Sequence, residues 1–335
     1  MREIEAERWL SIQQDLGRAR NTILAYRHAL DDYLQFCAQQ QLQVQEANRA
    51  HIALYVRSLT SRPMPGVGDP SAGVPRTGLA NATVCLRLTA VRLYYDHLVE
   101  EGIRTNNPVG RGRYTRSGGF GGTRSRALVP RYTALPWVPN DEEWRAVLEA
   151  ARQGPLRNRL MLALAYDAGL RREELCSLCT GDLDPANRLL HVRAETTKGR
   201  RARVLPYSVP TGTLLSAYLA HRRSLTRERG LLFVSESKRN RAAPITLWTW
   251  SKVVQVLARD AALPRLGTHT FRHLCLTDLA RAGWELHEIA TFAGHRSTST
   301  TLLYIHLSGR DLSAKFARAA SPHGARMIQV AEVLK

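Results

Sequence analysis

The sequence predicts a mainly helical protein with one small antiparallel β-sheet, organised as two domains joined by a basic linker. Three observations support this fold class. At 335 residues the chain is long for a single domain. Apolar residues recur at helical spacing over most of the chain, and strand-like alternation is confined to residues 188–207. A Gly/Arg-rich stretch without apolar periodicity separates the two helical parts.

The N-terminal domain is expected over residues 1–109 and is built from helices. One helix starts at Asn21 or Thr22, and a later helix ends at Gly102. Both carry apolar side chains three or four residues apart, the pattern of a helix with one buried face. These positions are Ile23, Tyr26, Leu30, Tyr33, Leu34 and Cys37 in the first helix and Val84, Leu88, Val91, Tyr94, Tyr95 and Leu98 in the second. Between the helices, residues 62–78 are rich in Pro and Gly, which predicts a flexible loop.

The linker is expected over residues 110–139. It holds six arginines and no acidic residue. A Gly-rich basic segment of this kind is typical of an open linker that follows a phosphate backbone. The arginines predicted to contact phosphates are Arg111, Arg113, Arg116, Arg124 and Arg126, together with Arg200 and Arg201 outside the linker.

The second domain is expected over residues 140–309. Asn140 is a helix N-cap followed by acidic residues, and a further helix with the sequence NRLMLALAYDA follows and ends at Gly169. Residues 188–207 alternate as in an antiparallel hairpin with Lys198-Gly199 at its tip. From Thr270 onward the spacing is helical again, with a short loop expected at residues 297–300 before Tyr304. The tail of residues 310–335 ends in an apolar patch that requires burial, either on its own domain or on a neighbouring copy of the chain.

The composition narrows the class of protein. A net charge of +19 indicates a polyanionic partner, and nucleic acid is the first candidate. There is no signal peptide and no charge-free apolar run of the roughly 18 residues that a membrane span needs, so a cytoplasmic location is expected. Five cysteines outside any disulfide pattern indicate a reducing compartment. Cys176 and Cys179 are predicted to lie in one amphipathic helix without a second ligand pair, so no metal site is expected.

Five residues of the second domain match the needs of phosphodiester transfer: Arg171, Lys198, His269, Arg272 and Tyr304. Guanidinium groups complement the charge that develops on a pentacoordinate phosphorus. A phenol oxygen can hold the phosphate covalently, so that strands are rejoined without a nucleotide cofactor. His269 and Arg272 lie one helical turn apart, so both side chains can point into one pocket.

The lysine at the predicted hairpin tip is a candidate general acid. The chain contains 43 arginines and only five lysines, so a basic position is arginine by default. Arginine cannot serve as a general acid, because a pKa of about 12.5 or more keeps it protonated. Lys198 therefore indicates a position at which a proton must be released.

These residues lie in four of five short segments that occur in a fixed order, and the fourth segment adds His295: GLRREELCSL, TKGRRARVLP, HTFRH, FAGH and TLLYIH. The segments resemble the catalytic boxes of the tyrosine recombinase (phage integrase) family. RNTILAYRHALDDYLQF and ATVCLRLTAVRLYYDHLVEEG are similar to the helical core-binding domain of that family. The departures are LCLTDLA after HTFRH, Ala293 where leucine is usual, and the loop of residues 62–78, which has no clear counterpart.

The resemblance implies a role for each reacting group. Arg171 and Arg272 would hold the scissile phosphate. Tyr304 would attack it, forming a 3′-phosphotyrosyl link. Lys198 would protonate the leaving 5′-hydroxyl, and the same step in reverse would rejoin the strands.

The resemblance also implies supporting roles. His269 and His295 would assist proton transfer and hydrogen-bond the phosphate, and Glu174 would orient the site. His273 and His306 are expected to support the site as neighbours or to cap helices.

The implied molecule is a C-shaped clamp on duplex DNA, made of a helical core-binding domain and a mixed α/β catalytic domain. It would be a site-specific recombinase or integrase, or a transposase of the same chemistry, that acts through a Holliday junction. The implied partners are two paired double-stranded DNA sites and accessory DNA-bending or partner recombinase proteins. The implied assembly is a homotetramer on the two sites. It would act in the cytoplasm at a bacterial nucleoid and would need no cofactor. The alternatives are a type IB topoisomerase and a non-catalytic DNA-binding protein of the same fold.

Overall fold

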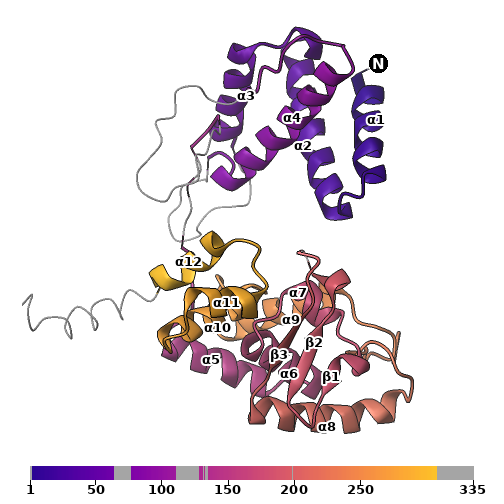
Figure 1. Ribbon diagram of the computed structural model, residues 1–335, viewed down its shortest axis with the longest axis vertical. Helices are drawn as coiled ribbons and strands as arrows, with labels where there is room; N and C mark the ends of the chain where they lie inside the picture. The colour runs from indigo at the N-terminus through magenta and orange to yellow at the C-terminus, as the bar shows by residue number, and fades with distance from the viewer. Residues whose placement is uncertain are drawn as a thin grey trace, which may run out of the picture. The chain divides into compact units, whose positions relative to one another are not determined.

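The computed structural model describes residues 2–63, 77–110, 128–130, 132, 135–197 and 199–307. The chain divides into two compact units, Met1–Ala134 and Leu135–Lys335 (Figure 1). The predicted linker contacts Arg111, Arg113, Arg116, Arg124 and Arg126 lie outside the described residues, as do Lys198, the tail of residues 310–335 and most of the predicted loop at 62–78. The predicted domain limits and the clamp arrangement stay predictions.

The described residues of the first unit form four helices, which include the two that the apolar spacing predicted. They are α1 (Arg2–Asp15), α2 (Arg20–Gln39), α3 (Arg49–Ser61) and α4 (Asn81–Glu100), with a 3-10 turn at Val44–Glu46. Aromatic side chains fill the core between them: Trp9, Tyr33, Tyr55, Tyr94 and Tyr95. α4 ends two residues before Gly102, whose φ of +72° suits glycine.

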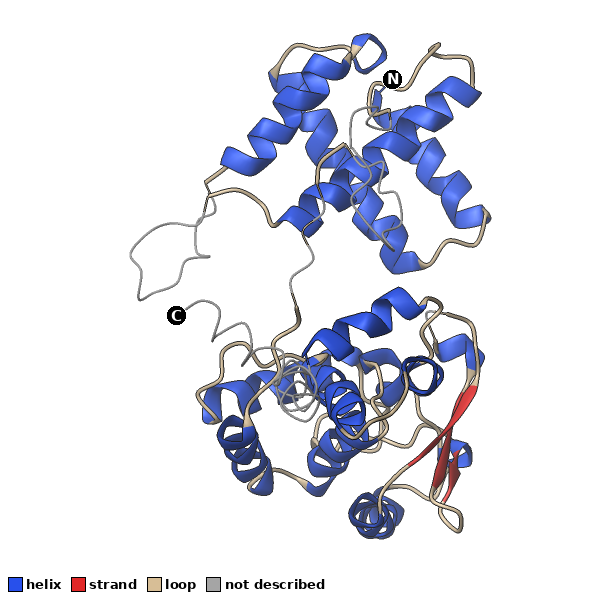
Figure 2. Cartoon of the chain, turned by 60° about the vertical axis from the view of Figure 1, so that its left-hand side comes forward, coloured by secondary structure: helices blue, strands red, loops and turns tan. Residues whose placement is uncertain are grey.

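The second unit combines eight helices of the described chain with a three-stranded sheet. The helices are α5 (Asp141–Arg152), α6 (Leu156–Asp167), α7 (Arg172–Cys176), α8 (Val209–Leu225), α9 (Leu247–Asp260), α10 (Thr270–Arg281), α11 (Leu286–Ala293) and α12 (Thr298–Leu307). The strands β1 (Leu183–Asp184), β2 (Leu189–Val192) and β3 (Arg203–Pro206) pair antiparallel in the order β1-β2-β3. The sheet lies at one side of the unit (Figure 2).

Three sequence-based expectations for this unit were wrong in detail. The predicted antiparallel hairpin is present as β2 and β3, but its strands are shorter than predicted. Residues after Val192 leave the strand, because Ala194–Thr196 form a 3-10 turn held by hydroxyl groups of Thr196 and Thr197. The predicted loop at 297–300 is largely helical, because α12 already starts at Thr298.

The third correction concerns the cysteines. Cys176 and Cys179 do not share a helix: α7 ends at Cys176, and Cys179 precedes the next 3-10 turn, Thr180–Asp182. None of the five cysteines, all of them in described segments, forms a disulfide.

Within the described residues no three His, Cys, Asp or Glu side chains are grouped so as to hold a metal ion. No described helix is long and apolar enough to cross a membrane.

The core of the second unit positions α10, α11 and α12. These three helices pack against one another, and α10 also packs on α6 (Figure 1). Phe271, Ile289, Phe292 and Ala293 are buried in the shared core. The turns at the ends of α6, α10 and α11 are therefore held close together, and most of the predicted site residues lie on them.

Candidate active site

Two arginines reach the same turn from different elements. Arg272 lies in the first turn of α10, and Arg171 directly precedes α7. Arg272 donates from Nη1 to the carbonyl oxygen of Gly169 at 2.6 Å and from Nη2 to the carbonyl oxygen of Ala293. Arg171 donates from Nη2 to the carbonyl oxygen of Gly294 at 3.4 Å. Both guanidinium groups thus contact the turn that follows α11.

Arg272 is a buried cation with neutral partners. Its side chain is held by two carbonyl oxygens and by Nε2 of His295, which lies 3.1 Å from Nη2. Only 3% of the residue is exposed. Burial, followed by the charge of Arg171, lowers the pKa of Arg272 to about 10. A buried charge without a direct counter-ion is costly, so an anion bound beside Arg272 would be strongly stabilised.

Glu174 links Arg171 to a third arginine, Arg203, on strand β3. Arg171 donates to Glu174 from its backbone N at 2.9 Å and from Nη1 at 2.8 Å. Arg203 donates from Nη1 to Oε1 at 3.1 Å and from Nη2 to Oε2 at 2.7 Å. Burial alone would raise the pKa of Glu174, but the hydrogen bond and charge of Arg203, together with Arg171, lower it to about 2. The three side chains carry a net charge of +1, so Glu174 does not cancel the positive potential of the site.

Tyr304 lies on α12 with its ring in the core of the unit and its hydroxyl in a polar environment. The residue is 3% exposed. Its hydroxyl oxygen lies 2.9 Å from Nδ1 of His273, and its ring lies parallel to that of His295, with centroids 6.0 Å apart and 9° between the planes. Burial raises the pKa of Tyr304, while the charges of Arg272 and Arg171 act to lower it. The phenol is thus held beside two cations that favour its deprotonated form.

Three imidazoles surround the phenol and the arginines. His295 is fixed at both ring nitrogens, by Arg272 at Nε2 and by the hydroxyl of Thr301 at Nδ1, 2.8 Å away. Burial, followed by the charge of Arg272, lowers the pKa of His295 to about 3. Burial likewise lowers the pKa of His273 to about 4 and also lowers that of His269, which precedes α10. All three rings are therefore neutral near pH 7.

The hairpin loop approaches this group of residues. A Cβ atom built on Gly199 would lie 3.5 Å from Cγ of Arg296, the residue after His295. Lys198, the predicted general acid, directly precedes Gly199 but is outside the described residues. Arg200 and Arg201, predicted to contact phosphates, are exposed on the same loop.

The structure brings most of the predicted site together. The Arg171–Glu174 pair and the group of Arg272, His295 and Tyr304 meet at the turn after α11, where Arg171 contacts Gly294 and Arg272 contacts Ala293. The ring of His269 lies 6.3 Å from that of His273. The side chain of His306 lies outside the described residues.

Sequence reasoning missed Arg203 and Thr301 and understated His273. Arg203 follows the strand alternation of RVLP, but one arginine among 43 carries no local sign of burial. His273 lies one turn after His269 on α10, and that spacing was the available signal for a second imidazole facing the same way.

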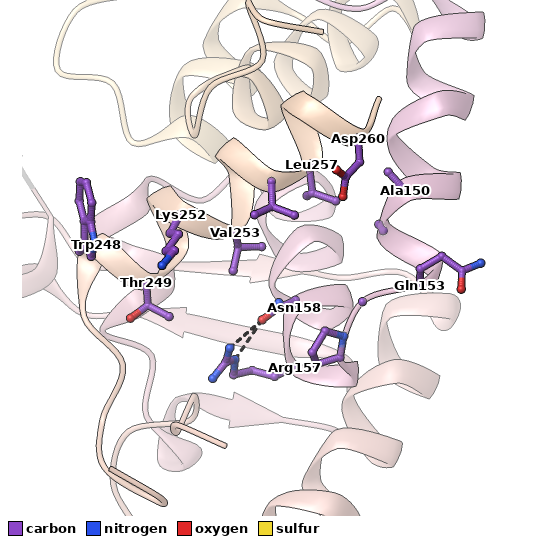
Figure 3. Close-up of a pocket in the computed structure, with 14 residues that line it drawn as sticks. Ala150, Gln153, Arg157, Asn158, Trp248, Thr249, Lys252, Val253, Leu257 and Asp260 are labelled. Atoms are coloured by element: carbon purple, nitrogen blue, oxygen red, sulfur yellow. Dashed lines mark hydrogen bonds between the residues drawn. The ribbon is translucent and has the colours of Figure 1, made fainter. Parts of the chain in front are cut away.

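A separate pocket lies between α5 and α9. It has a volume of about 470 Å³ (Figure 3). Trp248, Lys252, Val253, Leu257 and Asp260 line it from α9, and residues 150, 151, 153–155, 157 and 158 line it from the end of α5 and the start of α6. Arg157 and Asn158 are hydrogen-bonded at its wall. None of the residues around Tyr304 lines it, so the pocket is distinct from the candidate active site.

Comparison with known proteins decides the family. The model of the phage integrase family matches residues 139–310, and the model of the phage integrase N-terminal SAM-like domain matches residues 7–102. The chain belongs to the phage integrase family. It is a tyrosine recombinase, as its relatives are. The match confirms both the fold class and the enzyme class that the sequence predicted.

Relatives of this tyrosine recombinase include two mycobacterial proteins. The tyrosine recombinase XerC of Mycobacterium sp. (strain KMS) is 30% identical over 246 residues, which are 71% of this chain and 76% of the relative. That of Mycobacterium tuberculosis (strain ATCC 25177 / H37Ra) is 30% identical over 258 residues, 74% of this chain and 80% of the relative.

Solved structures share the fold. XerH recombinase bound to palindromic difH substrate in a post-cleavage complex matches with a TM-score of 0.65 at 19% identity, over 90% of this chain and 80% of that chain. A lambda integrase dimer bound to a COC′ core site matches with a TM-score of 0.63 at 17% identity, over 90% of this chain and 94% of that one.

Proposed function

We propose that this tyrosine recombinase cleaves and rejoins double-stranded DNA at specific sites, with Tyr304 as the nucleophile. The observation that carries the proposal is the convergence at one turn of Arg171, Arg272 and His295, with the hydroxyl of Tyr304 beside them. A phosphodiester carries one negative charge, shared by its two non-bridging oxygens. Two guanidinium groups match the arrangement of these oxygens.

The arginines would stabilise the transition state more than the ground state. Arg272 is fixed by neutral acceptors, and Arg171 is fixed by Glu174 while Arg203 offsets the charge of that carboxylate. Donors held in place before the reaction need no reorganisation when charge develops on the phosphorus oxygens. Neutral His269 would add a hydrogen bond to the same oxygens, and His295 would hold Nη2 of Arg272 in place.

The chemical step moves one proton to the leaving group. The phenol oxygen of Tyr304 releases its proton to a basic group beside it and forms a bond to phosphorus, while the bond to the 5′-oxygen breaks and Lys198 donates a proton to that oxygen. The product is a 3′-phosphotyrosyl link and a free 5′-hydroxyl. A 5′-hydroxyl from a partner strand reverses the step, so exchange at two sites proceeds through a Holliday junction.

The proposed assembly is a homotetramer on two paired DNA sites, with accessory DNA-bending or partner recombinase proteins as further partners. The basic residues Arg111, Arg113, Arg116, Arg124, Arg126, Arg200 and Arg201 would contact phosphates, in keeping with the net charge of +19. The tail of residues 310–335 would pack on its own protomer or on a neighbour. The proposed place of action is the bacterial nucleoid, because the relatives named XerC come from bacteria.

A nicked suicide substrate tests the proposal. Cleavage beside the nick releases a short strand, which prevents rejoining and traps the covalent complex. The wild-type protein is expected to form an SDS-resistant adduct with DNA that carries its site, and Tyr304→Phe is expected to bind that DNA without forming the adduct. Relaxation of plasmids that lack any specific site, at the same rate as ordinary substrates, would contradict site-specific recombination and favour a topoisomerase.

A further inference from the structure

His273 contacts the proposed nucleophile directly. It lies on α10 one residue after Arg272, and its Nδ1 atom is 2.9 Å from the hydroxyl oxygen of Tyr304. The two rings are tilted by 34°, with centroids 5.7 Å apart. The backbone N of His273 donates to the carbonyl oxygen of His269 at 3.0 Å, so the helix fixes the position of the imidazole.

The surroundings of the phenol favour Tyr304 as the donor in this hydrogen bond. The charges of Arg272 and Arg171 act to lower the pKa of Tyr304 and so favour release of its proton. The phenol O–H then needs an acceptor. Nδ1 of His273 is within reach and is an acceptor when the neutral ring carries its proton on Nε2. Burial and the neighbouring charges keep the ring of His273 neutral, so the acceptor is present near pH 7.

Other basic groups near the phenol are already engaged. His295 uses Nε2 with Arg272 and Nδ1 with Thr301. Glu174 is held by Arg171 and Arg203. His273 is therefore the acceptor that lies in direct contact with the hydroxyl of Tyr304.

We infer that His273 is a catalytic residue that takes the proton of Tyr304 as the nucleophile attacks. This inference rests on the proposed function. The phenol O–H bond breaks as the O–P bond forms, and the proton moves to Nδ1 of His273. The P–O bond to the 5′-oxygen breaks, and that oxygen takes a proton from Lys198. In rejoining, the incoming 5′-hydroxyl returns a proton to Lys198, and the released phenolate recovers its proton from His273.

Two substitutions at His273 test whether cleavage depends on the hydrogen-bond acceptor at Nδ1 or on the shape of the ring. His273→Phe keeps a planar ring but has no acceptor, whereas His273→Asn places an amide oxygen near the position of Nδ1. Adduct formation on the suicide substrate is expected to slow by roughly a hundredfold or more in His273→Phe, the usual size of general-base effects, and by less than about tenfold in His273→Asn. His287→Asn, at a largely exposed histidine on α11, is the matched control and should cleave at the wild-type rate. Equal losses in the Phe and Asn variants would overturn the inference.

A second test changes the leaving group or the nucleophile and measures whether cleavage by each variant is restored. Because each variant is compared with itself, the test is informative even if the substitution lowers stability. A 5′-bridging phosphorothiolate substrate needs no proton on its leaving sulfur, so it should restore cleavage to Lys198→Ala and not to His273→Phe. Difluorotyrosine at position 304 loses its proton more readily, so it should restore cleavage to His273→Phe and not to Lys198→Ala. Rescue of His273→Phe by the sulfur substrate, or no rescue by difluorotyrosine, would contradict a role on the nucleophile.

The same experiments distinguish this inference from the proposed function. If the wild-type protein forms an adduct that requires Tyr304 while His273→Phe cleaves within twofold of wild type, only the role of His273 fails. If no adduct forms at Tyr304 in the wild-type protein, the proposed function fails, and the inference fails with it.

Discussion

Arg203 donates two hydrogen bonds to Glu174 from the terminal nitrogens of its guanidinium group, at 3.1 and 2.7 Å. These bonds connect strand β3 to the carboxylate that also contacts Arg171. Nε of Arg203 also donates to the carbonyl oxygen of Phe292 at 3.0 Å, near the end of α11. One side chain therefore joins three elements that carry site residues. Glu174 is 1% exposed, so the pair has little access to water.

Arg203→Met should destabilise the protein more than the loss of a surface arginine. Removing one partner of a buried ion pair leaves an uncompensated charge and typically costs about 3 to 5 kcal/mol, although Arg171 still contacts Glu174. The free energy of unfolding in urea measures the loss. The double variant Arg203→Met Glu174→Gln should recover part of it, because the stranded carboxylate is gone. A double variant no more stable than Arg203→Met would contradict this explanation.

Gly294→Ala tests the close packing of Arg203 on the turn after α11. Gly294 has a φ of +61°, and an added Cβ would lie 3.1 Å from Nη1 of Arg203. Gly283 also has a positive φ, +89°, but a Cβ there meets nothing within 4 Å. Both alanine variants should lose roughly 1 to 2 kcal/mol from the left-handed backbone, and Gly294→Ala should also slow adduct formation. Equal cleavage rates in the two variants would show that the contact with Arg203 does not matter to the site.

Acidification should destabilise the protein between pH 7 and pH 4. In the unfolded chain histidines take up protons below a pH of about 6.5 and glutamates below about 4.3. In the folded protein the pKa values of His273, His295 and Glu174 are lowered to about 4, 3 and 2. The unfolded state therefore binds more protons over this range, and stability falls as pH falls.

Urea unfolding midpoints at constant ionic strength would measure this pH dependence. His273→Asn removes one titrating group and should make the decline shallower. A midpoint that stays constant or rises on acidification would contradict the burial of neutral imidazoles.

Chelation should leave strand cleavage intact. Arg171 and Arg272 supply the positive charge at the proposed phosphate site, so the mechanism assigns no step to a metal ion. The amount of adduct formed on the suicide substrate is expected to be the same within twofold with and without EDTA. Loss of the adduct in EDTA, restored by added magnesium, would contradict this mechanism.

Local sequence signals located most of the site, and long-range packing determined the rest. Short segments were enough to predict four site residues, because each lies at a helix end or about one helical turn from another predicted site residue: Arg171, Arg272, His295 and Tyr304. Arg203 meets Glu174 across 29 positions of sequence, and only its long-range contacts with Glu174 on α7 and Phe292 on α11 distinguish it from the other arginines. The end of β2 was misjudged because threonine hydroxyl groups satisfy backbone carbonyls there and compete with strand pairing.

The central claim is that a single phenol, at position 304, carries the DNA during strand exchange. Mass spectrometry of the protease-digested adduct from the suicide substrate would identify the residue bonded to the 3′-phosphate. The peptide that contains Tyr304 should carry the nucleotide, at the tyrosine itself. A nucleotide attached to any other side chain, or an adduct that persists in Tyr304→Phe, would contradict the mechanism.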